Sequence, residues 1–171
     1  MKYKNISVTL GGEKTVKLAS CELSGRSGHE AGRYLLEALY RSETGEDLPP
    51  IHVAERGKPY FEGSGWHFSI SHTKRHAFCA LSKEPVGIDA EELDRDINLR
   101  LADKILSPSE KLQFDAAEDQ RLALLTFWVL KEAQAKYTGE GLRGYPNKTE
   151  FTLDDPRGRT MDGCLVAVTG G

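Results

Sequence analysis

One long amphipathic segment, from about Asp119 to Thr138, places the strongest constraint on the fold. Successive residues of an α-helix are rotated by about 100°, so residues three and four apart share a face. Six positions of this segment fall within an arc of about 120°: Leu122, Leu125, Trp128, Val129, Glu132 and Lys136. The pattern predicts a helix that ends at Gly139 and packs its apolar face against the rest of the protein.

Glu132 and Lys136 interrupt the face that should be buried. As an i,i+4 pair they could form a surface ion pair that contributes a few tenths of a kcal/mol. That explanation accounts for their spacing but not for their place in the apolar stripe, where ionisable groups more often line a cleft. With the adjacent Lys131, the helix offers one carboxylate for a metal and two ammonium groups for phosphates.

A second pair of carboxylates lies in a predicted strand, Val86–Glu91. Side chains alternate across a strand, so Asp89 and Glu91 share one face while Ile88 and Ala90 share the other. Neighbouring carboxylates repel each other unless a cation, solvent or a raised pKa relieves the repulsion. Oxygen ligands suit Mg²⁺, which commonly also holds substrate phosphates. Alternatively, the strand leaves the sheet at this point and both carboxylates are exposed to water, so that no metal ion is needed.

Two upstream turns carry further polar groups. The segment Ser69–Lys74 ends a strand with hydroxyls, an imidazole and a lysine, which could bind an anion or form a solvent-exposed hairpin tip. Gly57-Lys58-Pro59 is a turn with a lysine at its tip and indicates little alone. His67, His72 and His76 fit no recognised zinc spacing, so the spacing predicts no transition-metal site.

The predicted elements together indicate an α+β fold, with helices set against a largely antiparallel sheet. Ser107, Pro108 and Glu110 form a capping-box pattern that predicts the start of another helix. The other expected helices cover about 28–41 and 95–104. The expected strands cover about 3–10, 51–54, 66–71, 77–81, 86–91, 150–153 and 164–169. Both halves place a helix before strands that end in a small apolar run, which suggests two related subdomains in one compact unit.

Composition excludes classes rather than naming a function. The 171 residues include 23 Lys and Arg against 26 Asp and Glu, a net charge of −3 that argues against broad nucleic-acid binding. The three cysteines, Cys21, Cys79 and Cys164, are widely spaced and are expected to be reduced thiols of a cytoplasmic protein. Neither a membrane span nor a signal peptide is expected.

Taken in order, four segments resemble the 4′-phosphopantetheinyl transferases of the surfactin-synthetase-activating type. The family couples a strand reading Val/Ile-Gly-Ile/Val-Asp-x-Glu to a helix reading Trp/Phe-x-x-Lys-Glu-Ala/Ser-x-x-Lys, and residues 86–91 and 128–136 match these patterns. Gly57-Lys58-Pro59 and Ser69-Ile70-Ser71-His72 resemble two further family segments. The resemblance runs from about Gly28 to the end of the chain.

Three departures from the family pattern stand out. Val129 replaces a small residue, Ser69 stands where the family often has asparagine, and the region before Gly28 lacks clear counterparts of the basic residues for the coenzyme A 3′-phosphate. With 88 residues ahead of Asp89, the chain resembles the tandem, pseudo-dimeric form of the family. The resemblance implies two subdomains: residues 1–84, on the coenzyme A-binding side, and residues 85–171, which would bind the metal and receive the carrier protein. The tandem form also implies a monomer.

The resemblance implies a holo-acyl-carrier-protein synthase activity. The enzyme would transfer 4′-phosphopantetheine from coenzyme A to a serine of an apo carrier protein and release adenosine 3′,5′-bisphosphate. Mg²⁺, or Mn²⁺ as the alternative, would be held by Asp89, Glu91 and Glu132. Glu132 is the first candidate for the base and Lys136 the second. The implied coenzyme A contacts are Lys58 and Pro59 at the adenine, Ser71, His72, Lys131 and Lys136 at the phosphates, and Arg26 and Arg33 at the 3′-phosphate.

Carrier proteins of this kind are acidic, so a cationic and apolar surface should receive them. The candidates follow the metal strand: Arg95, Arg100, Lys104 and Lys111, with Ile105 and Leu106 between them. Two other function classes stay open at this point. One is a Mg²⁺-dependent nuclease or phosphohydrolase, and the other is a non-catalytic adaptor that binds coenzyme A or a carrier.

Overall fold

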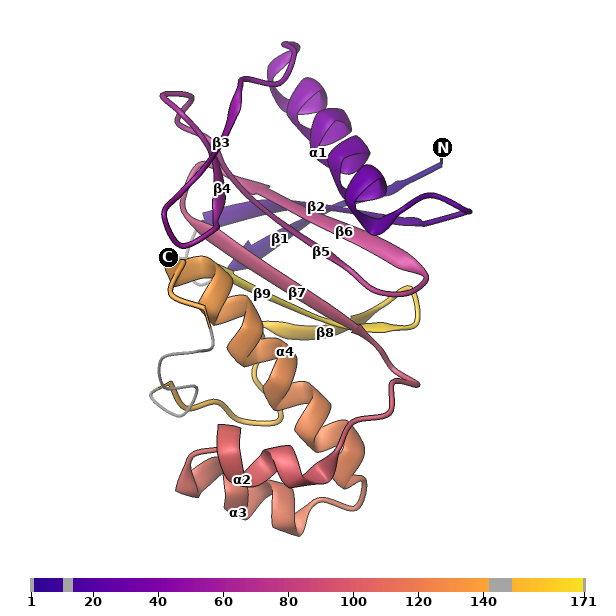
Figure 1. Ribbon diagram of the computed structural model, residues 1–171, viewed down its shortest axis with the longest axis vertical. Helices are drawn as coiled ribbons and strands as arrows, with labels where there is room; N and C mark the ends of the chain where they lie inside the picture. The colour runs from indigo at the N-terminus through magenta and orange to yellow at the C-terminus, as the bar shows by residue number, and fades with distance from the viewer. Residues whose placement is uncertain (1, 11–13, 142–148, 171) are drawn as a thin grey trace.

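The first sheet has four antiparallel strands, and helix α1 covers its outer face (Figure 1). The computed structural model describes residues 2–10, 14–141 and 149–170. In the order β1-β2-β6-β5, the strands are β1 (Lys4–Leu10), β2 (Lys14–Glu22), β6 (His76–Ser82) and β5 (His67–His72). Helix α1 (Gly28–Thr44) begins with a capping box of Ser27 and Glu30 and buries leucines against β2 and β6.

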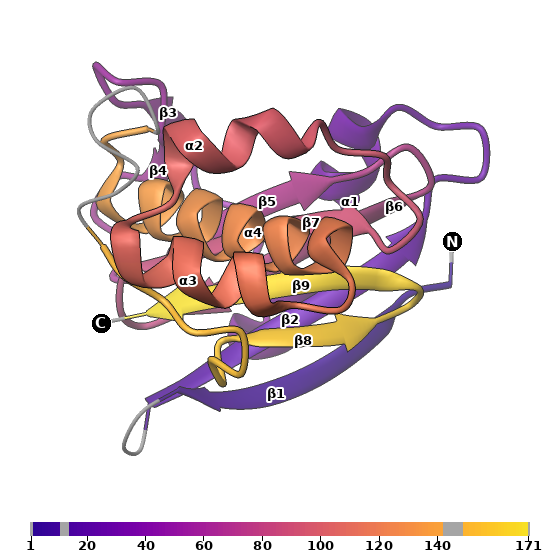
Figure 2. The ribbon, with the colours of Figure 1, turned by 90° about the horizontal axis from the view of Figure 1, so that it is seen from below.

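The second sheet has three antiparallel strands and packs between the first sheet and helix α4 (Figures 1 and 2). Its order is β7 (Val86–Glu92), β9 (Cys164–Gly170) and β8 (Gly158–Met161). Ile88 and Val168 face the first sheet, while Leu165 and Ala167 pack against α4 (Gln120–Thr138). The molecule is therefore layered as helix, sheet, sheet and helix, which confirms the predicted α+β class.

Shorter elements complete the described part of the chain. The strands β3 (Ile51–Val53) and β4 (Pro59–Phe61) pair as a small ribbon. A 3₁₀ turn η1 (Leu99–Leu101) and the helices α2 (Ala102–Ile105) and α3 (Pro108–Ala116) lie beside α4 (Figure 2). The predicted capping box is confirmed, because the Ser107 side chain accepts a hydrogen bond from the Glu110 N–H and the Glu110 carboxylate accepts one from the Ser107 N–H.

Two serine side chains join the sheets where β5 passes β7. Ser69 Oγ accepts a hydrogen bond from the Ile88 N–H at 3.1 Å, and Ser71 Oγ accepts one from the Ala90 N–H at 3.1 Å. These hydroxyls satisfy buried donors of β7 that would otherwise need a neighbouring strand. The polar end of β5 is thereby fixed beside Asp89.

Some expectations about the elements were wrong. Residues 150–153 form no strand: the Phe151 N–H donates to Glu110 Oε1 at 2.9 Å, so a side chain replaces a strand partner, and the strand β8 begins only at Gly158. The expected helix over 95–104 is reduced to η1 and the single turn of α2. Strand β2 is longer than any other in the described residues, yet its mixed polar pattern gave no prediction.

The close approach of β7 and α4 depends on Gly87. A Cβ atom built there would lie 2.1 Å from the Ala133 carbonyl oxygen and 2.5 Å from the Tyr137 nitrogen. We expect Gly87→Ala to lower the free energy of unfolding by about 1–3 kcal/mol, because backbone must move to admit the methyl group. Urea unfolding measures this. In the control Gly158→Ala, the methyl group would meet its nearest atom at 3.6 Å, and equal losses in both variants would contradict the steric explanation.

Candidate active site

A partly buried ion pair between β7 and α4 forms the centre of the site. Lys136 Nζ lies 3.0 Å from Asp89 Oδ1 and 3.4 Å from the Ile70 carbonyl oxygen, so the lysine bridges α4, β7 and β5. Ser71 Oγ donates a hydrogen bond to the same Asp89 oxygen at 3.2 Å. The side chain of Asp89 is 10% exposed and that of Lys136 is 33% exposed. The predicted strand and helix are thus brought together with Asp89 and Lys136 facing each other.

The second oxygen of Asp89 has an unusual environment. Asp89 Oδ2 is buried and has no hydrogen-bond partner, although most buried polar atoms in proteins have one. Burial raises the pKa of Asp89, and this effect outweighs the opposing effects of Lys136 and Ser71. An unpaired carboxylate oxygen at this depth is suited to accept a cation.

The other two predicted metal ligands share this unfavourable environment. Burial, followed by the negative charges of Asp89 and Glu91, raises the pKa of Glu132 to about 7. Burial also raises the pKa of Glu91, despite an ion pair with Arg95. The negative charge of one carboxyl group therefore raises the pKa of its neighbours. A cation bound between the three groups would remove this repulsion and favour their ionised forms. Oxygen donors alone fit a hard divalent cation such as Mg²⁺.

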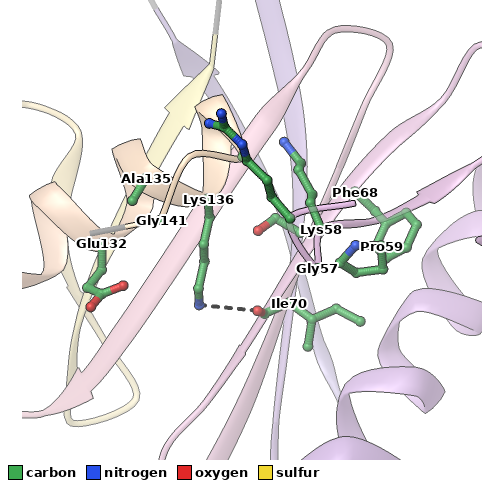
Figure 3. A pocket seen from close by; sticks show the side chains of 12 residues that line it. Gly57, Lys58, Pro59, Phe68, Ile70, Glu132, Ala135, Lys136 and Gly141 are labelled. Atoms are coloured by element: carbon green, nitrogen blue, oxygen red, sulfur yellow. Dashed lines mark hydrogen bonds between the residues drawn. The ribbon is translucent and has the colours of Figure 1, made fainter. Parts of the chain in front are cut away.

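A cavity of about 250 Å³ opens beside Glu132 and Lys136 (Figure 3). Glu132 and Lys136 line it from α4, and Ser69 and Ile70 line it from β5. Lys58, in the turn before β4, and Pro59, the first residue of β4, complete this part of the lining. Lys58 Nζ donates to the Tyr137 carbonyl oxygen at 2.8 Å, which places a cation at the carboxyl end of α4. Burial lowers the pKa of Lys58. The cavity thus joins a carboxylate, two ammonium groups and apolar walls.

The structure does not bring Lys131 into this cavity. Its Nζ lies 2.8 Å from Glu110 Oε2 on the opposite side of α4 and also donates to the Thr149 carbonyl oxygen at 3.1 Å. The prediction that Lys131 offers its ammonium group to phosphates is therefore wrong for this arrangement. Residues 131 and 136 are separated by about 140° around a helix, so only one of them can face β7.

The remaining predicted residues lie on the surface. His72 is exposed at the end of β5, next to Gly28, where an added Cβ would meet the imidazole. Arg26 and Arg33 are exposed, and Arg26 borders a hollow that does not include Lys58 or Lys136. Among the proposed docking residues, Arg100 and Lys104 are exposed, Arg95 pairs with Glu91, and Lys111 pairs with Asp103 and Asp115.

Sequence reasoning missed the positioning role of Ser69 and the pairing of Arg95 with Glu91. The sequence does indicate the pairing of Arg95, since Glu91 and Arg95 have opposite charges and are four residues apart. A second polar cluster, formed by His76, Glu92 and Cys164, was also missed. These residues come from three strands, so no local spacing could have revealed them.

Comparisons with known proteins agree with the motifs. Residues 85–164 match the model of the 4′-phosphopantetheinyl transferase superfamily. A 4′-phosphopantetheinyl transferase gsp of Aneurinibacillus migulanus is 32% identical over 109 residues, which are 63% of this chain and 44% of that protein. A 4′-phosphopantetheinyl transferase of Bacillus subtilis is 36% identical over 93 residues, 53% of this chain and 41% of that protein.

The 4′-phosphopantetheinyl transferase HetI of Nostoc is 31% identical over 122 residues, 66% of this chain and 52% of that protein. The matches thus span about half or less of the length of these relatives. None of the helices within the described ranges is long and apolar enough to cross a bilayer. The comparisons confirm that this chain resembles the 4′-phosphopantetheinyl transferases of the Sfp type, through a matched segment that carries Asp89, Glu91, Glu132 and Lys136.

Proposed function

We propose that this protein transfers 4′-phosphopantetheine from coenzyme A to a serine hydroxyl of an apo carrier protein and releases adenosine 3′,5′-bisphosphate. One observation carries the proposal. The buried Asp89, with one oxygen that has no hydrogen-bond partner, forms an ion pair with Lys136. Lys136 lines a cavity together with Glu132, whose pKa is raised to about 7. This arrangement lies within the segment that matches the transferase superfamily.

Each side chain has a role that follows from its surroundings. Asp89, Glu91 and Glu132 would hold Mg²⁺, which supplies charge neutralisation at the pyrophosphate. Lys136 places a fixed positive charge next to the same phosphates, and Lys58 borders the adenine end of the cavity. Glu132 accepts the proton of the attacking serine hydroxyl, because a carboxyl with a pKa of about 7 is well matched to proton transfer near neutral pH.

The arrangement of the sheets supports two subdomains, 1–84 and 85–171, built as a pseudo-dimer. The first contributes the four-stranded sheet, the small β3-β4 ribbon and α1, and the second contributes the three-stranded sheet and α4; coenzyme A binds between them. The exposed Arg100 and Lys104 offer a cationic surface to an acidic carrier. The protein acts as a cytoplasmic monomer in this proposal, since one chain supplies both halves.

A pH-dependent stability is expected for the metal-free protein. Glu132 has a folded-state pKa of about 7 against an ordinary value of 4.5. The folded state therefore binds more protons between these values, and this contribution to stability is present at low pH and lost as the pH rises through about 7. The melting temperature of the wild type should therefore fall relative to that of Glu132→Gln from about pH 5 to about pH 8, because glutamine carries no charge at either pH.

Added Mg²⁺ should raise the melting temperature more at about pH 8 than at about pH 5, because its carboxylate ligands must be ionised. A thermal shift series at both pH values, with and without Mg²⁺, measures this. A Mg²⁺ shift that is equal at the two pH values, or unchanged in Glu132→Gln, would contradict cation binding at this site.

Intact-protein mass spectrometry tests the transfer itself. An apo carrier protein is incubated with the enzyme, coenzyme A and Mg²⁺, using carriers of fatty-acid, polyketide and nonribosomal-peptide type. A gain of one phosphopantetheine on any carrier, abolished by a metal chelator, is the expected result. Asp47→Asn, which removes an exposed carboxylate away from both the cavity and the proposed docking surface, should leave the gain unchanged. Unmodified carriers of all three types would overturn the proposed reaction.

A further inference from the structure

A second cluster of ligand-type side chains lies apart from the proposed active site. His76 comes from the start of β6, Glu92 from the end of β7 and Cys164 from the start of β9. His76 Nδ1 lies 3.3 Å from Glu92 Oε1 and 3.6 Å from Cys164 Sγ, and the three donor atoms all lie within 4.8 Å of one another. An imidazole, a carboxylate and a thiol therefore converge on one point from both sheets.

Two of the three donor separations match those around a small tetrahedral ion. Bonds of about 2.1 Å to nitrogen and oxygen and about 2.3 Å to sulfur hold tetrahedral donors about 3.4–3.6 Å apart. The two measured separations from Nδ1 are close to this range. The mixed nitrogen, oxygen and sulfur set suits Zn²⁺ and similar ions better than Mg²⁺, which prefers oxygen alone.

Neighbouring residues orient the carboxylate of Glu92 towards the cluster. Arg75 Nε and Nη2 donate to Glu92 Oε2 at 3.1 and 2.8 Å, while Oε1 accepts from the Thr73 hydroxyl and the Arg75 backbone N–H and lies 3.3 Å from His76 Nδ1. Burial would raise the pKa of Glu92, but hydrogen bonds from Arg75, Thr73 and His76 lower it to about 2, so the carboxylate is charged. Such outer partners, which fix the orientation of a ligand, are typical of metal sites in proteins.

We propose that His76, Glu92 and Cys164 bind a divalent transition-metal ion of the Zn²⁺ class. His76 ligates through Nδ1 and carries its proton on Nε2. The Cys164 thiol releases its proton to the buffer as the sulfur–metal bond forms, with no change of oxidation state. His76 also borders a surface hollow lined by Ser20 and Asp162, through which the ion enters and a water completes its coordination.

This site is distinct from the carboxylate site around Asp89. Glu91 and Glu92 are neighbours in β7, and successive side chains of a strand point to opposite faces. Glu91 accordingly pairs with Arg95, whereas Glu92 pairs with Arg75 and His76. An ion bound by Glu92 would link β6, β7 and β9 and so join the two sheets. The proposal does not rest on the transferase activity.

Titration with Co²⁺ as a spectroscopic substitute for Zn²⁺ tests the proposal on the full chain. Excess Mg²⁺ is added so that the oxygen ligands around Asp89 are occupied by the harder ion. The expected result is a thiolate-to-cobalt charge-transfer band in the wild type. The matched control Cys79→Ser, which alters another fully buried thiol, should retain the band, and Cys164→Ser should lose it.

His76→Gln keeps the thiol and should weaken Co²⁺ binding by about 10- to 100-fold or more, since loss of even an orienting partner has that effect. This variant keeps the test decisive if Cys164→Ser fails to fold. Zn²⁺ should displace Co²⁺ and remove the band. Absence of the band in folded wild type at saturating Co²⁺, a band that persists in Cys164→Ser, or unchanged affinity in His76→Gln would each overturn the site.

Discussion

Replacement of Glu132 by glutamine is expected to reduce the rate of phosphopantetheine transfer by about 10²–10⁴-fold, the usual contribution of a positioned base. Glutamine has the same shape but cannot accept the serine proton, and it removes a negative charge from the group formed with Asp89 and Glu91. The fold should persist, because Glu132 lines a cavity rather than the core. Single-turnover mass spectrometry of the carrier measures the rate.

The pH profile separates the role of a base from that of a metal ligand. In the wild type the rate should rise with pH as Glu132 ionises, and higher Mg²⁺ should move this rise to lower pH because a bound cation favours the carboxylate. In Glu132→Gln the rise should be lost. Full rescue of the variant by high Mg²⁺ would assign Glu132 to metal binding alone. Glu140→Gln, at an exposed position just beyond α4, is the matched control and should transfer at the wild-type rate.

The helix and strand that carry this site could be predicted because their burial patterns are local. Leu125 and Val129 of α4 are buried as the helical spacing predicted, although Leu122 is 36% exposed. In β7, Ile88 and Ala90 alternate with carboxylates along the sequence, although nearly the whole strand is buried. The charged exceptions, Asp89, Glu132 and Lys136, were visible against that regular background. Strand β2 was missed because one end of it is exposed and polar, which hides the alternation.

Other features depend on contacts between distant segments, which sequence spacing does not encode. The capping box predicted the start of α3, but not that Glu110 would also bind Lys131 and the Phe151 N–H from elsewhere in the chain. The same bond to Phe151 explains why the strand expected at 150–153 is absent. A charged residue on a helix can face a cleft or a buried partner, and only the packing distinguishes the two.

Replacement of Lys131 by methionine is the second change with a large expected effect. The side chains of Lys131 and Glu110 are 2% and 0% exposed, and their charged atoms lie 2.8 Å apart. Loss of the ammonium group leaves Glu110 as a buried charge without its cationic partner, which typically costs about 3–5 kcal/mol. We expect urea unfolding to show a loss of that size. Lys111→Met, which breaks a surface pair with Asp115, should cost at most about 1 kcal/mol.

The double variant Lys131→Met, Glu110→Gln should recover part of the stability, because it removes the second charge. Recovery should be incomplete, because Ser107 and Phe151 donate to different oxygens of Glu110 and the single amide oxygen of glutamine can keep only one of these hydrogen bonds. Coenzyme A binding by folded Lys131→Met should equal that of the wild type, since this lysine faces away from the cavity. Weakened coenzyme A binding at unchanged stability would instead restore the phosphate role predicted from the sequence. The two measurements together therefore decide whether this charged residue of α4 serves the fold or the ligand.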